Sequence, residues 1–119
     1  MKRVLIVDDE PDIASLVALC LAPLGVQVVA ATGLLSALRV ARVEDIGLVL
    51  LDLALGDEDG LEILPRLRDE PRLAGVPVVA FTAHDSRRRE AIDSGVDSFL
   101  PRPFASADLQ STVELHFVA

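Results

Sequence analysis

The chain has no tryptophan, no tyrosine and a single cysteine, and aromatic residues make up only 3% of its 119 residues. Because a lone cysteine has no partner within the chain, an intramolecular disulfide is excluded, which agrees with a reducing compartment. No apolar run reaches the roughly 20 residues that span a bilayer, and no signal peptide is visible. We therefore expect a cytoplasmic protein, not attached to a membrane, whose core is aliphatic.

Positive charge is also scarce, because 11 Lys and Arg residues stand against 19 Asp and Glu, for a net charge of −8. An acidic surface repels phosphate backbones and anionic lipids, so we expect no direct binding to nucleic acid or membranes. Hydrophobic residues make up 51% and charged residues 25%, which is the balance of a globular protein. At this length we expect one domain, assigned to residues 1–119.

Five short apolar runs alternate with five longer amphipathic segments. The runs, expected to form strands buried on both faces, are residues 4–7, 26–30, 48–51, 76–81 and 97–100. The segments, expected to be helical, are residues 13–24, 34–41, 61–67, 86–94 and 106–117. Pro65 should disturb the third helix locally. The alternation predicts an α/β fold with a parallel sheet covered on both faces.

The ends of four predicted strands bring polar groups: Asp8 and Asp9, then Asp52, then Thr82 with the backbone of Ala83, and finally Arg102. In open parallel sheets ligands bind outside the carboxyl ends of the strands, so we expect these residues to share one pocket. Three neighbouring carboxylates stay ionised at low cost only beside a cation, and hard oxygen ligands favour Mg²⁺. We expect Asp9 and Asp52 to be direct ligands, and Asp8 to bind directly or through water.

Such a pocket suits phosphoryl transfer, because Mg²⁺ neutralises the transferring group and a carboxylate can form an acyl phosphate. Asp52 follows the run expected to lie centrally, and we assign it as the phosphoacceptor. The Thr82 hydroxyl and the Ala83 backbone N–H would donate to phosphoryl oxygens. Arg102 would supply the remaining positive charge.

Four segments of the sequence, spread over essentially the whole chain, resemble the receiver domain of bacterial two-component response regulators. They are VLIVDDEP at residues 4–11, LLDLALGDEDGLE at 50–62, VVAFTA at 78–83 and SFLPRPF at 98–104. Each segment alone is weak evidence for the resemblance, but all four in this order are specific to the family. The resemblance implies a flavodoxin-like (βα)5 three-layer sandwich with strand order 2-1-3-4-5. It also implies that Asp52 takes its phosphoryl group from the phosphohistidine of a histidine kinase or phosphotransfer protein.

The resemblance implies further roles around the pocket. The backbone carbonyl of Ala54 would complete the Mg²⁺ site, and the Arg102–Pro103 peptide bond would be cis. Thr82 matches the switch hydroxyl, and Phe99 matches the aromatic side chain that turns inward on activation. The last two strand–helix segments match the usual signalling face, through which a homodimer would form. Such a domain is a signalling phosphoacceptor, not an enzyme, although it assists its own phosphoryl transfer and hydrolysis.

Residues Ala54 and His84 border the phosphoryl site in this family. We hypothesise that together they set water access and hence the lifetime of the acyl phosphate. An exposed histidine at a helix start is an equally ordinary explanation of His84. The run Arg87-Arg88-Arg89 is interpreted as a solvated helix face.

The sequence departs from the family pattern at two positions. Arg102 stands where lysine is usual, and its longer planar group would either reach the phosphoryl group or point to solvent. Gly56 stands where proline is usual, and we expect the loop at Gly56-Asp57 to be looser.

Three alternative functions follow from the same residues. A phospho-independent pseudo-receiver is supported mainly by Arg102. A phosphohydrolase with an aspartyl nucleophile is disfavoured, because such enzymes carry Asp-x-Asp where this chain has Asp8-Asp9-Glu10. A flavin carrier is disfavoured by the acidic pocket and by the lack of Trp and Tyr.

Overall fold

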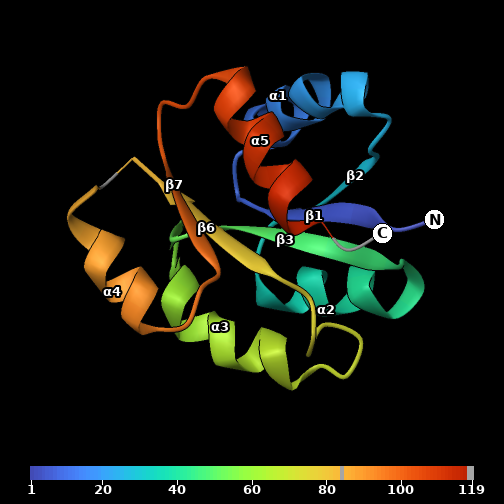
Figure 1. The fold of residues 1–119 in the computed structure, drawn as a ribbon. Coiled ribbons are helices and arrows are strands. Elements are labelled where there is room, and N and C mark those ends of the chain that lie inside the picture. The colour runs from blue at the N-terminus through green and yellow to red at the C-terminus, as the bar shows by residue number, and fades with distance from the viewer. Residues whose placement is uncertain (84, 118–119) are drawn as a thin grey trace.

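The computed structural model describes residues 1–83 and 85–117. Its centre is a five-stranded parallel sheet of order β2-β1-β3-β6-β7. The strands are β1 (Arg3–Val7), β2 (Val28–Ala31), β3 (Ile46–Asp52), β6 (Val78–Thr82) and β7 (Ser98–Pro101). Strands β4 and β5 belong to a separate hairpin, so β6 and β7 are the fourth and fifth strands of this sheet. The predicted order 2-1-3-4-5 is therefore confirmed (Figure 1).

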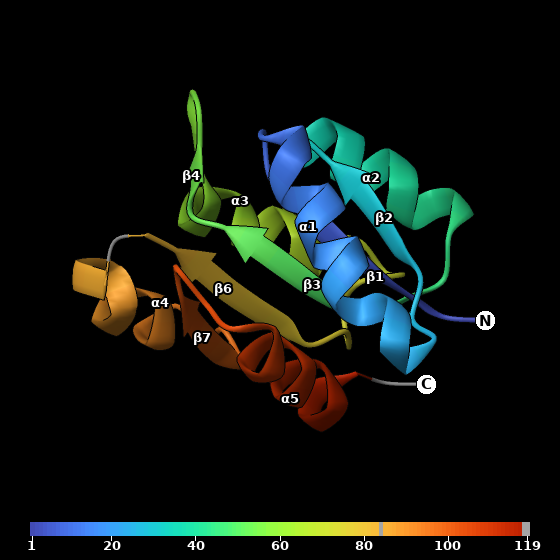
Figure 2. The ribbon, with the colours of Figure 1, turned by 90° about the horizontal axis from the view of Figure 1, so that it is seen from above.

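Helices cover both faces of the sheet, as Figures 1 and 2 show. The helices are α1 (Pro11–Leu21), α2 (Leu34–Val43), α3 (Gly60–Asp69), α4 (Arg88–Asp93) and α5 (Ser106–His116). Two 3-10 turns are η1 (Ala22–Leu24) and η2 (Asp85–Arg87). Helices α1 and α5 pack on one face, and α2, α3 and α4 pack on the other. No helix in the described ranges is long and apolar enough to cross a membrane.

The core has two halves because side chains alternate along each strand. In β1, Val4 and Ile6 face the α1 and α5 layer, whereas Leu5 and Val7 face the opposite layer. All seven residues of the central strand β3 are buried, which explains its unbroken apolar sequence. The sheet therefore carries Asp52, the last residue of β3, to its carboxyl edge between β1 and β6.

The structure corrects two local predictions and adds detail at a third position. Helix α3 runs from Gly60 to Asp69 without a break at Pro65. The fourth helix begins at Arg88, later than predicted, because residues 85–87 form the turn η2. Gly56 and Asp57, where a looser loop was expected, form the turn of a small antiparallel hairpin made by β4 (Ala54–Leu55) and β5 (Glu58–Asp59).

The hairpin turn needs glycine at its first position. Gly56 has a φ of 67°, in the left-handed region that most residues avoid. A positive φ at the first of two turn residues fits a type II′ hairpin, in which glycine normally takes that position. The hairpin therefore begins two residues after Asp52 and stands beside the acidic pocket.

Candidate functional site

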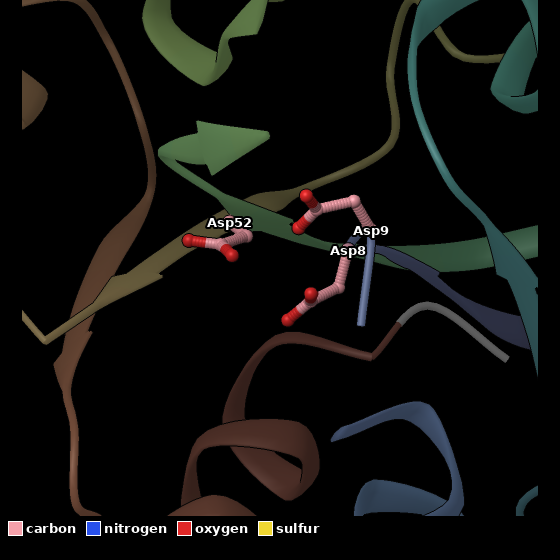
Figure 3. A group of neighbouring side chains, drawn as sticks. All are labelled: Asp8, Asp9 and Asp52. Atoms are coloured by element: carbon pink, nitrogen blue, oxygen red, sulfur yellow. The ribbon is translucent and has the colours of Figure 1, made fainter. Parts of the chain in front are cut away.

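Three acidic side chains meet at the carboxyl edge of the sheet (Figure 3). Asp8 and Asp9 follow β1, and Asp52 ends β3. One carboxylate oxygen from each of the three lies within 4.8 Å of the others. Asp8 and Asp52 are only 3% and 1% exposed, whereas Asp9 is exposed. The predicted convergence of these three residues is present in the structure.

Backbone N–H groups hold the two buried carboxylates in place. The N–H of Glu10 donates to Oδ1 of Asp8 at 2.8 Å, and the N–H of Ala54 donates to Oδ1 of Asp52 at 3.1 Å. The second oxygen of Asp8, Oδ2, is buried and has no hydrogen-bond partner among the described residues. A buried acceptor without a donor is costly, so this atom favours a cation nearby.

Arg102 points into the pocket instead of outward to solvent. Its Nη2 lies 3.3 Å from Oδ2 of Asp52, and its Nη1 lies 3.8 Å from Oδ2 of Asp8. The guanidinium also lies 5.0 Å from the centre of the Phe81 ring, and the side chain is 18% exposed. Both buried carboxylates therefore face the same fixed positive charge. The Arg102–Pro103 peptide bond is cis, as predicted.

Burial controls the protonation of both inner carboxylates. It raises the pKa of Asp8 to about 6, and the charge of Asp52 adds to this rise, while the Glu10 N–H and Arg102 oppose it. Burial likewise raises the pKa of Asp52 against the opposing effects of the Ala54 N–H and Arg102. Arg102 thus does not offset the cost of burying these two carboxylates, and added positive charge would favour their ionised forms.

The donor set fits a hard divalent cation. It offers carboxylate oxygens from three residues, one of them Oδ2 of Asp8, which accepts no hydrogen bond among the described residues, and oxygen is the ligand that Mg²⁺ prefers. The pocket offers few protein ligands and is open to solvent on the side where Asp9 is exposed. This suits Mg²⁺, which retains several of its water ligands. The pocket is therefore a candidate magnesium site.

The remaining predicted residues lie around this pocket or lead away from it. Thr82 ends β6 and is buried, and Ala83 follows it on the surface. Phe99 lies in β7, is 7% exposed, and packs into the core beneath α3 and α4. The guanidinium of Arg88 lies 5.5 Å from the centre of the Phe99 ring. Phe99 therefore faces inward in this structure. His84 lies outside the described residues.

Two features of the site were not foreseen from the sequence. One is the hairpin, whose Glu58 Oε1 accepts a hydrogen bond of 3.2 Å from the N–H of Leu34, at the start of α2. The dipeptide Gly56-Asp57 is a hairpin signal that could have revealed it. The other is Arg87, which was interpreted as part of a solvated face. Its side chain is only 23% exposed and binds Asp59 in the hairpin, so that interpretation is wrong for Arg87.

The fold is an α/β sandwich with an acidic pocket at the carboxyl edge of its parallel sheet, and comparison with known proteins identifies the family. The sequence model of the response regulator receiver domain matches residues 4–114, so this chain belongs to that family. Receiver domains of this family are signalling domains of two-component systems.

Named relatives and a solved structure agree with this assignment. The chain is 34% identical to the DNA-binding dual master transcriptional regulator RpaA of Synechocystis, over 95% of this chain and 48% of that protein. It is also 34% identical to the KDP operon transcriptional regulatory protein KdpE of Escherichia coli, over 97% and 51% of the two chains. The chain thus spans about half the length of these regulators. The receiver domain of the sensor histidine kinase PA1611 from Pseudomonas aeruginosa, solved with magnesium in its active site cleft, superposes with a TM-score of 0.83 at 26% identity, covering 97% of this chain and 96% of that one.

Proposed function

We propose that this chain is a Mg²⁺-dependent switch in which Asp52 accepts a phosphoryl group from the phosphohistidine of a histidine kinase or phosphotransfer protein. The observation that carries the proposal is the position of Asp52, buried at the end of the central strand beside two further carboxylates and one guanidinium. Such a transfer partner would place the chain in the cytoplasm.

The metal would be held by Asp8, Asp9, Asp52 and the backbone carbonyl of Ala54. When bound, Mg²⁺ would neutralise the oxygens of the transferring group. Support comes from the buried Oδ2 of Asp8, which accepts no hydrogen bond among the described residues, and from the magnesium ion in the similar Pseudomonas aeruginosa receiver domain. The exposed carboxylate of Asp9 leaves room for water and phosphoryl oxygens on the open side of the pocket.

In the transfer step, an oxygen of Asp52 forms a bond to phosphorus while the bond between phosphorus and the histidine nitrogen breaks. The electron pair of that bond leaves with the imidazole. Arg102, already 3.3 Å from Oδ2 of Asp52, would pair with a phosphoryl oxygen. The Thr82 hydroxyl and the Ala83 N–H would donate to the other oxygens. We assign Ala54 and His84 to the control of water access, and expect His84→Ala to change the rate of autodephosphorylation.

The output would pass through Thr82 and Phe99 to the surface formed by α4, β7 and α5. Thr82 ends the strand next to Asp52, and β6 pairs with β7, which carries Phe99. Phosphorylation would then shift an equilibrium between two conformations of this surface, where a partner or a second copy of the chain binds.

The experiment is incubation of the full chain with acetyl phosphate and Mg²⁺, followed by mass spectrometry. We expect a mass gain of one phosphate in the wild type and none in Asp52→Asn. Asp69→Asn, which changes an exposed acid at the far end of α3, should react like the wild type. A wild type that gains no mass, or an Asp52→Asn variant that still does, contradicts the proposal.

One observation favours a second candidate, a phospho-independent pseudo-receiver. Arg102 contacts both Asp52 and Asp8, so the pocket is partly neutralised by its own side chain. The same acetyl phosphate experiment separates the two functions, because a pseudo-receiver remains unmodified under conditions in which Mg²⁺ is saturating.

A further inference from the structure

Arg87 connects the start of α4 to the segment that follows Asp52. Its Nη2 donates to Oδ1 and Oδ2 of Asp59 at 3.1 and 2.9 Å, and its Nη1 donates to the Leu53 carbonyl at 3.4 Å. Its Nε donates to Oε1 of Glu90 at 3.0 Å, within α4. One guanidinium thus joins the hairpin, the backbone beside Asp52 and α4.

The acceptor on Leu53 is the point of this network closest to the pocket. The Leu53 carbonyl also accepts the N–H of Gly60 at 2.9 Å, and the Leu53 N–H donates to the Phe81 carbonyl at 3.3 Å. The next residue, Ala54, supplies the N–H that holds Asp52 and, in the proposed function, the carbonyl that binds the metal. Arg87 is therefore bonded to the peptide group that joins Leu53 to Ala54.

The carboxylate of Asp59 both caps α3 and binds Arg87, so it links the two elements. It accepts the N–H of Leu61 at 2.9 Å, which caps α3, and it binds Arg87 with both oxygens. Burial alone would raise its pKa, but the hydrogen bonds from Arg87 and Leu61 lower it overall. Hydrogen bonds to Glu90 and Asp59 also raise the pKa of Arg87, so both partners stay charged at neutral pH.

A nearby arginine, Arg89, is placed differently. Arg89 is 91% exposed and pairs with Asp93 of its own helix at 3.7 Å. Arg87 is 23% exposed and reaches residues that lie 28 and 34 positions earlier in the sequence. Arg89, two residues further along the chain in α4, is therefore a matched control.

We propose that Arg87 is a positioning residue, which fixes the Leu53–Ala54 backbone beside Asp52 and so sets the affinity of the pocket for Mg²⁺. The inference rests on the proposed function. Arg87 does not touch the reacting atoms; it acts through Leu53 and Asp59. Outer partners that orient metal ligands typically change metal affinity by about 10- to 100-fold when removed.

The test compares Mg²⁺ affinity, measured by calorimetry on the full chain, with the rate of phosphorylation by acetyl phosphate. We expect Arg87→Ala to weaken Mg²⁺ binding about 10-fold. We also expect it to slow phosphorylation at low Mg²⁺, with recovery when Mg²⁺ is raised. Circular dichroism at low Mg²⁺ must show that the variant is folded, because an ion that binds only the folded state would also rescue a partly unfolded variant. Arg87→Lys should have a Mg²⁺ affinity between those of the wild type and Arg87→Ala, because the compact ammonium group cannot bind Asp59 and Leu53 together as the guanidinium does.

A second variant separates positioning from folding. Asp59→Asn keeps an oxygen that caps α3 but loses the charged partner of Arg87. Asp59→Asn should lower the Mg²⁺ affinity as much as Arg87→Ala does. The double variant should bind Mg²⁺ as tightly as each single variant, because both changes break the same contact. Arg89→Ala should match the wild type in both measurements.

The outcomes distinguish this inference from the function on which it rests. A wild type that is phosphorylated, together with an Arg87→Ala variant of unchanged Mg²⁺ affinity and rate, overturns the inference and leaves the proposed function standing. A wild type that gains no phosphate overturns both. If circular dichroism shows that Arg87→Ala does not fold, Asp59→Asn takes its place. An Asp59→Asn variant with unchanged Mg²⁺ affinity and rate then overturns the inference.

Discussion

The guanidinium of Arg102 lies 3.3 Å from the carboxylate of Asp52, a residue 50 positions earlier in the chain. This contact gives the pocket a counter-charge beside the carboxylate to which the proposed phosphoryl group would be attached. Because the same guanidinium also lies 3.8 Å from Asp8, it is shared between the two inner acids. Its contribution to phosphoryl transfer can be measured by replacing it.

Arg102→Ala should slow phosphorylation of Asp52 by about 100-fold, the usual cost of removing one group that stabilises a developing negative charge. Arg102→Lys should keep most of the rate, because a lysine also carries a permanent positive charge at neutral pH. The rate is measured as mass gain with acetyl phosphate at saturating Mg²⁺. An Arg102→Ala variant as fast as the wild type would show that Arg102 does not act on the phosphoryl group.

The raised pKa of Asp8 predicts a pH-dependent instability in the absence of divalent metal. The folded protein protonates Asp8 near pH 6, whereas the unfolded chain does so near 3.8. Above pH 6 the fold must carry a charge that it disfavours, which costs about 2 to 3 kcal/mol. Asp8→Asn should therefore be more stable than the wild type at pH 7.5 in EDTA. The difference should shrink as the pH falls from about 6 toward 3.8, as followed by urea unfolding. A difference that does not change with pH would contradict this prediction.

Mg²⁺ should stabilise the folded chain because it binds the acidic cluster only when the strand ends are together. At a concentration ten times the dissociation constant, the expected gain is about 1.4 kcal/mol. This corresponds to a rise in melting temperature of about 5 °C for a domain of this size. Calorimetry should show the rise in the wild type and in Asp69→Asn, and its loss in Asp9→Asn. An equal rise in all three would mean that the ion binds elsewhere.

Glycine at position 60 is required by close packing against the backbone of Asp52 and Leu53. A Cβ at Gly60 would collide with the Asp52 carbonyl oxygen and lie 2.8 Å from the Leu53 Cα. Gly60→Ala should therefore lower the free energy of unfolding by about 3 kcal/mol. At Gly75, by contrast, an added Cβ meets nothing within 4 Å, so Gly75→Ala should be close to neutral. Denaturant unfolding of the two variants checks the contrast, and a Gly60→Ala variant as stable as Gly75→Ala would refute it.

The sequence predicted the sheet and the pocket because both depend on patterns within short segments. The apolar run at 48–51 identified the buried central strand, and the acids that follow the first and third runs identified the pocket. The ends of the strands follow less closely from the sequence. The second strand begins at Val28, not Val26, because strand pairing and not hydrophobicity decides where a strand starts.

The parts that could not be predicted depend on contacts between distant residues. Whether Arg102 faced the pocket or solvent was not decided by its position alone, because a long side chain reaches either. The partners of Arg87 lie in a hairpin whose residues Glu58 and Asp59 are charged and carry no apolar signal for a strand. Only the folded arrangement places that hairpin beside η2 and turns a presumed surface arginine inward.

The two residues of β5 bind different neighbouring elements, because consecutive side chains on a strand point in opposite directions. Glu58 binds the start of α2, and Asp59 binds the start of α3 and Arg87. Inserting or deleting a single residue in the turn at Gly56 would exchange these directions and break both attachments at once. We therefore expect loop-length variation, which surface turns commonly tolerate, to be forbidden here, so grafts and tags should avoid this turn.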